Sequence, residues 1–184
     1  MNLSKLVDEI KKGDPKAQEC FYKQFSGRLF LLCRRYVKNT EDAEERMMDG
    51  FAKFFNHIDR FRYQGEAALN AWLQQIMVNE CIMQLRKRKS FSMVSDTAAA
   101  DVILDEDVLE KLSVTEIYKL VLRLPVGYRT VFNLSVFEGY DHKEIAAMLG
   151  INEGTSRSQL WKAKALLQKL LSRNEIGHAK QHSK

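Results

Sequence analysis

Hydrophobic residues recur every three or four positions along most of the chain, which is the period of one face of an α-helix. Four such stripes in the first half predict helices over residues 3–10, 16–37, 41–57 and 71–89. Residues 59–70 lack the stripe, contain Gly65 and are expected to form a loop or a frayed turn. The first half shows none of the alternating apolar pattern of strands. The pattern therefore predicts an all-α domain over residues 1–89.

The second half continues with shorter helical stripes. Ser113 and Glu116 have the spacing of a capping box for a helix that runs up to Leu124, and Pro125 precedes a further helix over residues 126–137. The inner face of the last helix is expected to hold Leu160, Ala163, Leu167, Leu170 and Leu171. This pattern predicts a second helical domain over residues 108–173. A polar tail over residues 174–184 is expected to be disordered.

Residues 140–155 are typical of two short helices joined by a tight turn. Asp141 can cap the first helix while Glu144 reaches back to the cap, as in a capping box. Gly150 suits the left-handed position that ends a helix, and Asn152 offers a cap for the second helix. This arrangement predicts a helix-turn-helix, whose second helix enters the major groove of DNA. Similar capped hairpins also occur in all-α proteins that bind no nucleic acid.

The charge pattern separates the two predicted domains. Residues 90–107 contain no Lys, Arg or His. The acids of this stretch are Asp96, Asp101, Asp105, Glu106 and Asp107. We therefore expect an acidic flexible linker between the domains.

The net charge of +5 is modest, but the positive charge is concentrated in two segments. The chain after Gly150 contains seven Lys or Arg residues and only two acidic residues, as expected where a phosphate backbone binds. The predicted helix over residues 71–89 ends in four consecutive bases and follows the aromatic loop around Phe61 and Tyr63. Cations beside aromatic rings suit single-stranded or melted DNA. A solvated helix end that complements the helix dipole is the alternative interpretation of the four bases.

The composition of the 184 residues predicts a soluble, mostly helical protein, because 45% are hydrophobic and only two are proline. The longest apolar run, residues 29–33, is too short for a membrane span or a signal sequence. We therefore expect a cytoplasmic location and no membrane insertion.

Cys20, Cys33 and Cys81 are odd in number and widely spaced, so buried thiols are expected rather than disulfides or a zinc site. The four histidines are scattered. We accordingly predict no metal, no cofactor, no catalytic residue and no small-molecule substrate; the protein is not expected to be an enzyme.

Several motifs, in order, resemble the extracytoplasmic-function branch of the sigma-70 family of bacterial RNA polymerase sigma factors. The motifs of the first half are residues 42–51, a helix that binds polymerase in the family, and residues 71–88, a segment that melts promoters. The motifs of the second half are residues 124–125, 128–129, 138–140, 144–146 and 154–158, in the domain that reads the upstream promoter element. The resemblance implies a dissociable specificity subunit whose partners are core RNA polymerase and promoter DNA. An anti-sigma factor is a further candidate partner.

The resemblance also implies roles for individual residues. Polymerase binding is assigned to Asp42, Glu45, Met48 and Asp49. Recognition and melting of the downstream element, with capture of an unstacked base in the loop, are assigned to Arg62, Tyr63, Gln64, Asn79, Arg86 and Arg88. Contacts with the upstream element are assigned to Arg129, on phosphate, and to Thr155, Arg157, Ser158 and Lys162.

The chain departs from the family pattern at some of these positions. Arg46 and Met48 stand where the family usually has an aliphatic residue and glutamine. Ser156 replaces a commoner valine, and Lys162 a commoner arginine, in the last helix. Lysine still binds phosphate, but it lacks the bidentate fork that arginine offers to guanine.

The alternative is a transcriptional activator of the LuxR kind, which carries a similar helix-turn-helix and binds DNA without polymerase. Its first half would be a sensor or an α/β receiver domain. The first half of this chain instead ends in a basic helix and has no strand pattern, which favours the sigma factor.

Overall fold

The computed structural model describes residues 2–88 and 114–181, and every regular element in these ranges is helical. The chain forms two compact units, Met1–Lys87 and Arg88–Lys184. The predicted all-α fold is confirmed for the described residues. The predicted linker and Ser113, the first residue of the expected capping box, lie outside the described residues.

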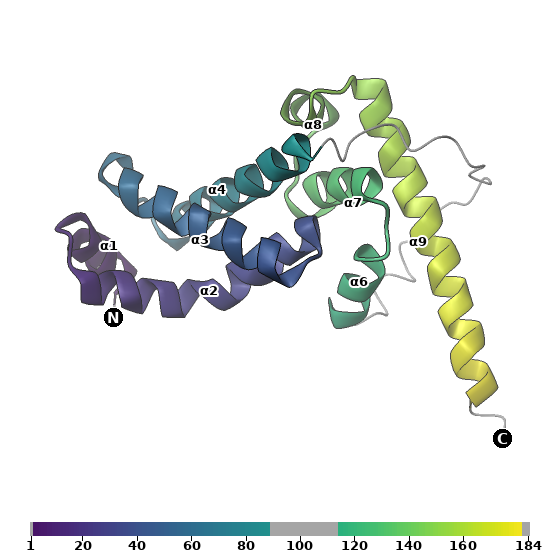
Figure 1. The fold of residues 1–184 in the computed structure, drawn as a ribbon, viewed down its shortest axis with the longest axis horizontal. Coiled ribbons are helices and arrows are strands. Elements are labelled where there is room, and N and C mark those ends of the chain that lie inside the picture. The colour runs from purple at the N-terminus through teal and green to yellow at the C-terminus, as the bar shows by residue number, and fades with distance from the viewer. Residues whose placement is uncertain (1, 89–113, 182–184) are drawn as a thin grey trace. The chain divides into compact units, whose positions relative to one another are not determined.

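The first unit consists of four helices and a short 3₁₀ turn (Figure 1). These elements are α1 Leu3–Lys11, α2 Pro15–Val37, α3 Thr40–His57, η1 Ile58–Arg60 and α4 Glu66–Lys87. The side-chain oxygens of Asn2, Asp14 and Asn39 accept hydrogen bonds from backbone N–H groups at the starts of α1, α2 and α3 respectively. These caps satisfy backbone N–H groups that have no partner within their helix.

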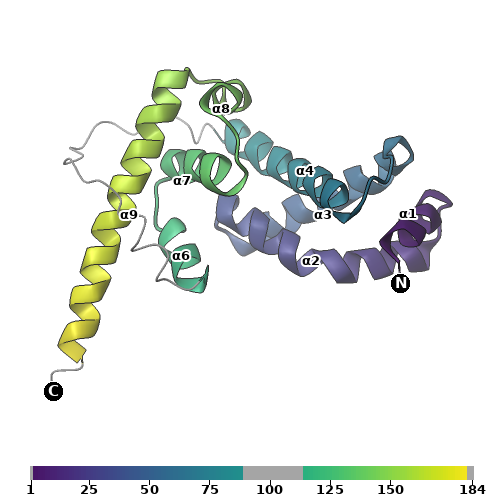
Figure 2. The ribbon, with the colours of Figure 1, turned by 180° about the vertical axis from the view of Figure 1, so that it is seen from behind.

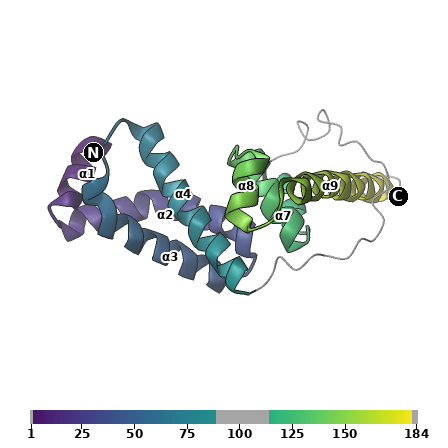
Figure 3. The ribbon, with the colours of Figure 1, turned by 90° about the horizontal axis from the view of Figure 1, so that it is seen from above.

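The core of the first unit lies between α2, α3 and α4, which pack against one another, as Figure 3 shows. Phe21 of α2 stacks on Phe54 of α3, with ring centroids 4.7 Å apart. Phe54 in turn contacts Trp72 of α4 at 5.0 Å. This aromatic cluster joins the three helices, and α1 packs against α2 and η1 at one end.

The second unit is built along its last helix (Figure 2). Its elements are α6 Val114–Val121, α7 Val126–Phe132, the π-helical turn η2 Asn133–Phe137, α8 His142–Leu149 and α9 Glu153–Gln181. Its buried core consists of Leu120, Val121, Leu124, Phe132, Ala163, Leu167, Leu170 and Leu171. Four of the five residues predicted for the inner face of the last helix lie in this core, and Leu160 packs against it partly buried.

The helix-turn-helix forms as predicted. Asp141 Oδ1 accepts a hydrogen bond from Glu144 N at 2.8 Å, and Asp141 N donates to Glu144 Oε2 at 2.9 Å, which completes the capping box. Gly150 ends α8 with a φ of 69°, and Asn152 Oδ1 accepts from Thr155 N at 2.7 Å. The turn between α8 and α9 is therefore fixed by hydrogen bonds at both ends.

Some element bounds differ from the prediction. α4 begins at Glu66 rather than near Ala71, so the loop is shorter than expected. The predicted helix over residues 126–137 ends in a π turn, which leaves Phe137 exposed. α9 continues to Gln181, past the predicted end at residue 173 and into the segment expected to be a disordered tail.

The expectation of three buried thiols is wrong for Cys20, which is exposed on α2. Cys33 and Cys81 are buried, and their hydrogen bond and then burial raise the pKa of Cys81 well above its ordinary value. A protonated, buried thiol is unreactive, so this pair acts as core packing.

Within residues 2–88 and 114–181, no helix has the length and apolarity that crossing a bilayer requires. The same ranges hold no group of His, Cys, Asp or Glu that could bind a metal ion.

The left-handed backbone of Gly150 predicts that adding a methyl group there lowers stability. Gly150→Ala places a Cβ on a left-handed residue and should lower the free energy of unfolding of the second unit by about 1 kcal/mol. Gly27→Ala is the control, because Gly27 lies exposed within α2 with open space around it; this change should stabilise the first unit by about 0.5 to 1 kcal/mol. Urea unfolding followed by circular dichroism measures both. A stabilising Gly150→Ala would contradict the described turn.

Candidate nucleic-acid interface

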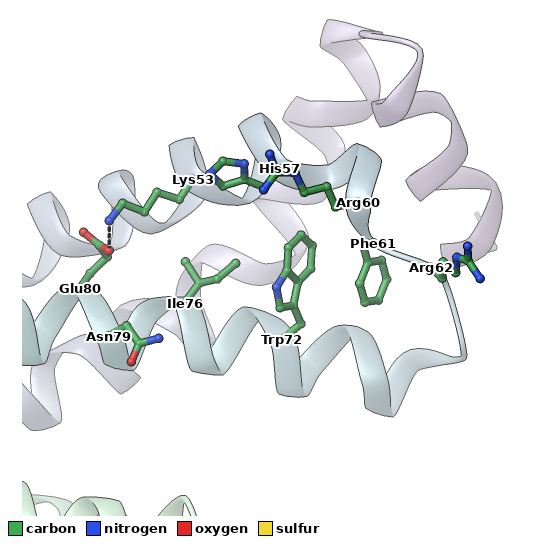
Figure 4. A pocket seen from close by; sticks show the side chains of 9 residues that line it. All are labelled: Lys53, His57, Arg60, Phe61, Arg62, Trp72, Ile76, Asn79 and Glu80. Carbon is green, nitrogen blue, oxygen red and sulfur yellow. Dashed lines mark hydrogen bonds and ion pairs between the residues drawn. The ribbon is translucent and has the colours of Figure 1, made fainter. Parts of the chain in front are cut away.

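A cavity of 440 Å³ opens between α3, η1 and α4 in the first unit (Figure 4). It is lined by Lys53, His57, Arg60, Phe61, Arg62, Trp72, Ile76, Asn79 and Glu80. This volume lies within the range of ligand pockets and is large enough for a small planar group such as a nucleobase.

One end of the cavity is aromatic. The rings of Phe61 and Trp72 lie parallel, with centroids 4.7 Å apart and an interplanar angle of 2°. Lys11 Nζ donates a hydrogen bond to the carbonyl oxygen of Phe61 at 2.7 Å, which ties the loop to α1. The position of Phe61 is thus set both by ring stacking and by a backbone contact. Flat aromatic surfaces of this kind stack on unpaired bases.

The other end of the cavity is polar, as Figure 4 shows. Lys53 Nζ lies 2.5 Å from Glu80 Oε1, and only 3% of Glu80 is exposed against 49% of the Lys53 side chain. Asn79 is exposed at this end of the cavity, whereas the exposed Arg60 lies near the aromatic rings, with the exposed His57 between Arg60 and Lys53. The cavity therefore combines cations for phosphate, an amide that can bond to a base edge and an aromatic wall.

The structure brings together only part of the predicted downstream set. Arg62 and Asn79 line the cavity, whereas Tyr63 and Gln64 belong to the same loop but do not line it. Arg86 and Arg88 are exposed at the end of α4, away from the lining residues. The lining residues absent from the predicted set are Lys53, His57, Arg60, Phe61, Trp72, Ile76 and Glu80. Their signal is the four-residue spacing of Lys53 with His57 and of Trp72, Ile76 and Glu80, which places each group on one helix face.

A second surface lies on the first turns of α9. Arg157 and Ser158 are exposed, while Thr155 and Lys162 are half-buried. Arg157 Nη2 lies 2.6 Å from Glu153 Oε2, one helical turn earlier. The predicted upstream residues of α9 thus remain accessible near the N-terminus of the second helix of the helix-turn-helix, where such motifs contact base edges.

Arg129 does not belong to this surface, and its predicted phosphate contact is corrected. Only 2% of Arg129 is exposed, and Arg129 Nη1 donates to the carbonyl oxygen of Leu124 at 3.0 Å. Burial lowers the pKa of this guanidinium. Arg129 therefore holds the turn between α6 and α7 from inside the domain, where its guanidinium is not exposed to a phosphate.

A third surface lies on α3, where all four predicted polymerase-binding residues are found. Met48 is 52% exposed, and Glu45 is also exposed. Asp42 Oδ1 accepts a hydrogen bond from Gln84 Nε2 at 3.1 Å, which joins α3 to α4. Arg46, which is nearly buried, pairs with Glu45 and with Asp49, the latter at 2.8 Å. Arg46 thus fixes two of the predicted contact residues, a role that the linear pattern did not indicate.

Burial lowers the pKa of Arg46, but the hydrogen bond with Glu45 and the charges of Asp49, Glu45 and Glu80 outweigh burial and raise it. The guanidinium therefore stays charged, and α3 presents an ordered acidic and apolar face.

Comparison with known proteins identifies the family to which the chain belongs. The family description of sigma-70 region 2 matches residues 21–91, and that of sigma-70 region 4 matches residues 115–167. The ECF RNA polymerase sigma factor SigW of Bacillus subtilis is 27% identical over 184 residues, covering 93% of this chain and 97% of SigW. SigM of Mycobacterium tuberculosis H37Rv is 29% identical over 161 residues, covering 86% of this chain and 79% of SigM. The sigma-E factor of Escherichia coli K12 is 27% identical over 172 residues, covering 86% of this chain and 88% of the sigma-E factor. The chain belongs to the extracytoplasmic-function branch of the sigma-70 family.

Each family region falls largely within one structural unit of this sigma factor. Region 2 contains most of α2 and all of α3 and α4, and with them the cavity and the acidic face of α3. Region 4 contains the helix-turn-helix and the exposed first turns of α9. Each surface described above therefore lies within one region of the sigma factor.

The buried carboxylate of the cavity leads to a stability prediction for region 2. Lys53→Met leaves Glu80 buried without its cation and should lower the free energy of unfolding by about 1 to 2 kcal/mol. Adding Glu80→Gln to that variant should recover most of the loss, because the amide is neutral. The matched control is Lys23→Met, which breaks an exposed pair with Glu19 and should cause no measurable change. Urea unfolding measures all three, and equal effects of the two lysine substitutions would contradict the role of burial.

Proposed function

We propose that this sigma factor binds core RNA polymerase, directs it to specific promoters and dissociates after initiation. The observation that carries the proposal is the order of the family regions, with region 2 on the first structural unit and region 4 on the second. The protein would act in the cytoplasm, where the polymerase transcribes, and would catalyse no reaction of its own. Its work consists of positioning the polymerase and stabilising opened DNA.

Polymerase binding would use the face of α3 that carries Asp42, Glu45, Met48 and Asp49. Ion pairs with Arg46 hold Glu45 and Asp49, so this face is ordered before the partner arrives. Preorganisation of this kind reduces the entropy lost on binding. An anti-sigma factor that covered the same face would compete with the polymerase.

Recognition of the downstream element would use the cavity of region 2. As the strands separate, an unstacked base could enter beside Phe61 and Trp72, with its edge toward Asn79. Lys53, Arg60 and Arg62 would lie near the phosphates of the same strand. Stacking on aromatic side chains contributes roughly 1 to 3 kcal/mol per base, which helps to offset the cost of unpairing. Arg86 and Arg88, exposed at the end of α4, would contact the backbone further along.

Recognition of the upstream element would use Thr155, Arg157, Ser158 and Lys162 on α9. Arg157 is the residue best suited to read a base, because its guanidinium can donate two parallel hydrogen bonds to guanine. Lys162 would bind phosphate.

One experiment separates this proposal from the LuxR-type activator, which the region 2 match does not support. The purified protein should bind core RNA polymerase and make it initiate at a discrete promoter, while binding that DNA weakly alone. Tight, sequence-specific binding without polymerase, and no transcript when polymerase is added, would refute the proposal.

The exposed guanidinium of Arg157 predicts a selective promoter defect. Arg157→Ala should reduce transcription roughly tenfold at promoters that depend on the upstream element and little at promoters that do not, since one bidentate base contact contributes about 1 to 3 kcal/mol. Arg123→Ala is the control, because it removes an equal charge from an exposed position between α6 and α7. In vitro transcription from matched promoters measures the ratio. Equal losses at both promoter classes would remove Arg157 from base reading.

The cavity predicts a defect in strand opening. Asn79→Ala should reduce the yield of opened promoter complexes roughly tenfold, while leaving binding to core polymerase unchanged. Asn56→Ala, an exposed amide on α3 outside the cavity, should have no effect. Permanganate modification of unpaired thymines reports opening, and competition for core polymerase reports binding. Normal opening by Asn79→Ala would exclude a role for this amide.

A further inference from the structure

A hydrogen bond crosses the centre of the helix-turn-helix. His142 Nδ1, on the first residue of α8, lies 2.9 Å from Ser156 Oγ, at the end of the first turn of α9. Ser156 is completely buried, and His142 is half-buried. We infer that His142 is a positioning residue, which through Ser156 sets the rotation of α9 about its own axis. This inference deepens the proposed function and rests on it.

The contact between His142 and Ser156 is directional, unlike the packing around it. The other buried residues of α8 and of the first turns of α9 are apolar, among them Ile145, Leu149 and Ala163. Apolar packing depends on shape and area but has little preference for angle, whereas a hydrogen bond weakens steeply when it bends. The bond between His142 and Ser156 therefore restrains rotation more sharply than the surrounding contacts do.

The buried hydroxyl of Ser156 needs a hydrogen-bond partner. A hydroxyl removed from water without a hydrogen bond costs free energy, so rotations of α9 that separate Ser156 from His142 are disfavoured. The caps at Asp141 and Asn152 determine where the helices begin. They do not by themselves determine which face of α9 points outward. Contacts between α8 and α9 determine which face of α9 points outward.

Rotation of α9 about its axis would change its contacts with bases. Ser156 lies between Thr155 and Arg157 in the chain, so any rotation at Ser156 moves both of them. A turn of about 20° displaces groups at the edge of a helix, roughly 5 Å from its axis, by about 2 Å. A displacement of that size breaks a bidentate contact with a base but leaves phosphate within reach of a flexible cation. Loss of the bond should therefore relax base preference more than it weakens DNA binding.

Three variants test the inference. His142→Leu removes the polar atom and keeps a similar volume. His142→Asn retains a hydrogen-bonding atom attached to Cγ, at the position of Nδ1, and serves as the matched conservative variant. Ser156→Ala removes the hydroxyl from the other side and leaves the half-buried His142 free to bond to water. Thermal unfolding of each variant establishes that region 4 is folded.

The measurement is in vitro transcription by core polymerase and each full-length variant, from a promoter pool with a randomised upstream element. For each position of the element, the ratio of transcripts from the preferred base to those from the other bases is determined. His142→Leu and Ser156→Ala should each reduce the ratio roughly three- to tenfold at the positions that depend on Arg157, as expected for loss of one hydrogen bond. The double variant should lose no more than either single variant, and His142→Asn should retain the wild-type ratios.

Several outcomes would overturn the inference. A uniform fall in transcription with unchanged base ratios would mean that the bond serves stability alone. An altered ratio with His142→Leu but not with Ser156→Ala would mean that His142 contacts DNA directly. Failure of the wild-type protein to support any promoter-specific transcript would instead refute the proposed function, so the two failures are distinguishable.

Discussion

The structure depends on how each helix satisfies the backbone N–H groups of its first turn. Five described helices begin at a residue whose side-chain oxygen accepts a hydrogen bond from one of these N–H groups. The five residues are Asn2, Asp14, Asn39, Asp141 and Asn152. Each cap fixes the residue at which its helix begins and therefore which residues share a face. In the helix-turn-helix this constraint continues through Gly150, so the direction of α9 follows from local hydrogen bonds. On the proposed function, the exposed first turns of α9 would read DNA only because that direction is fixed.

Buried charge is the second constraint, and it is found beside the functional surfaces. Glu80 reaches the cavity from within the core of region 2, and Arg46 underlies the acidic face of α3. Both are paired, as charges removed from water must be. An apolar residue at either position would pack without this requirement. What the charged residues add is orientation, because Glu80 holds Lys53 at the cavity and Arg46 holds Asp49 on the face of α3.

The helices, their caps and the helix-turn-helix could be predicted because each depends on residues a few positions apart. The start of α4 at Glu66 was missed because no strong cap precedes it in the linear pattern. The cavity was only partly predicted because Lys53 and Glu80 meet through packing of α3 on α4, across a separation that periodicity does not report. Arg129 was misassigned for the same reason, since an arginine beside a DNA-reading motif gives no sign in its own sequence that its guanidinium is turned inward.

The two proposed DNA surfaces, the cavity of region 2 and the first turns of α9, share a feature that bears on how the sigma factor would find its sites. In each, a cation suited to DNA is already paired with an acid, Lys53 with Glu80 and Arg157 with Glu153. An acid beside the cation weakens the attraction for phosphate that every DNA sequence shares, and this attraction supplies most non-specific binding. Contacts made only with the correct base or with an unpaired strand are less affected, because they depend on geometry. On the proposed function, the polymerase would supply the general affinity. The task of α9 then narrows from finding a site to choosing among the sites that the enzyme already visits.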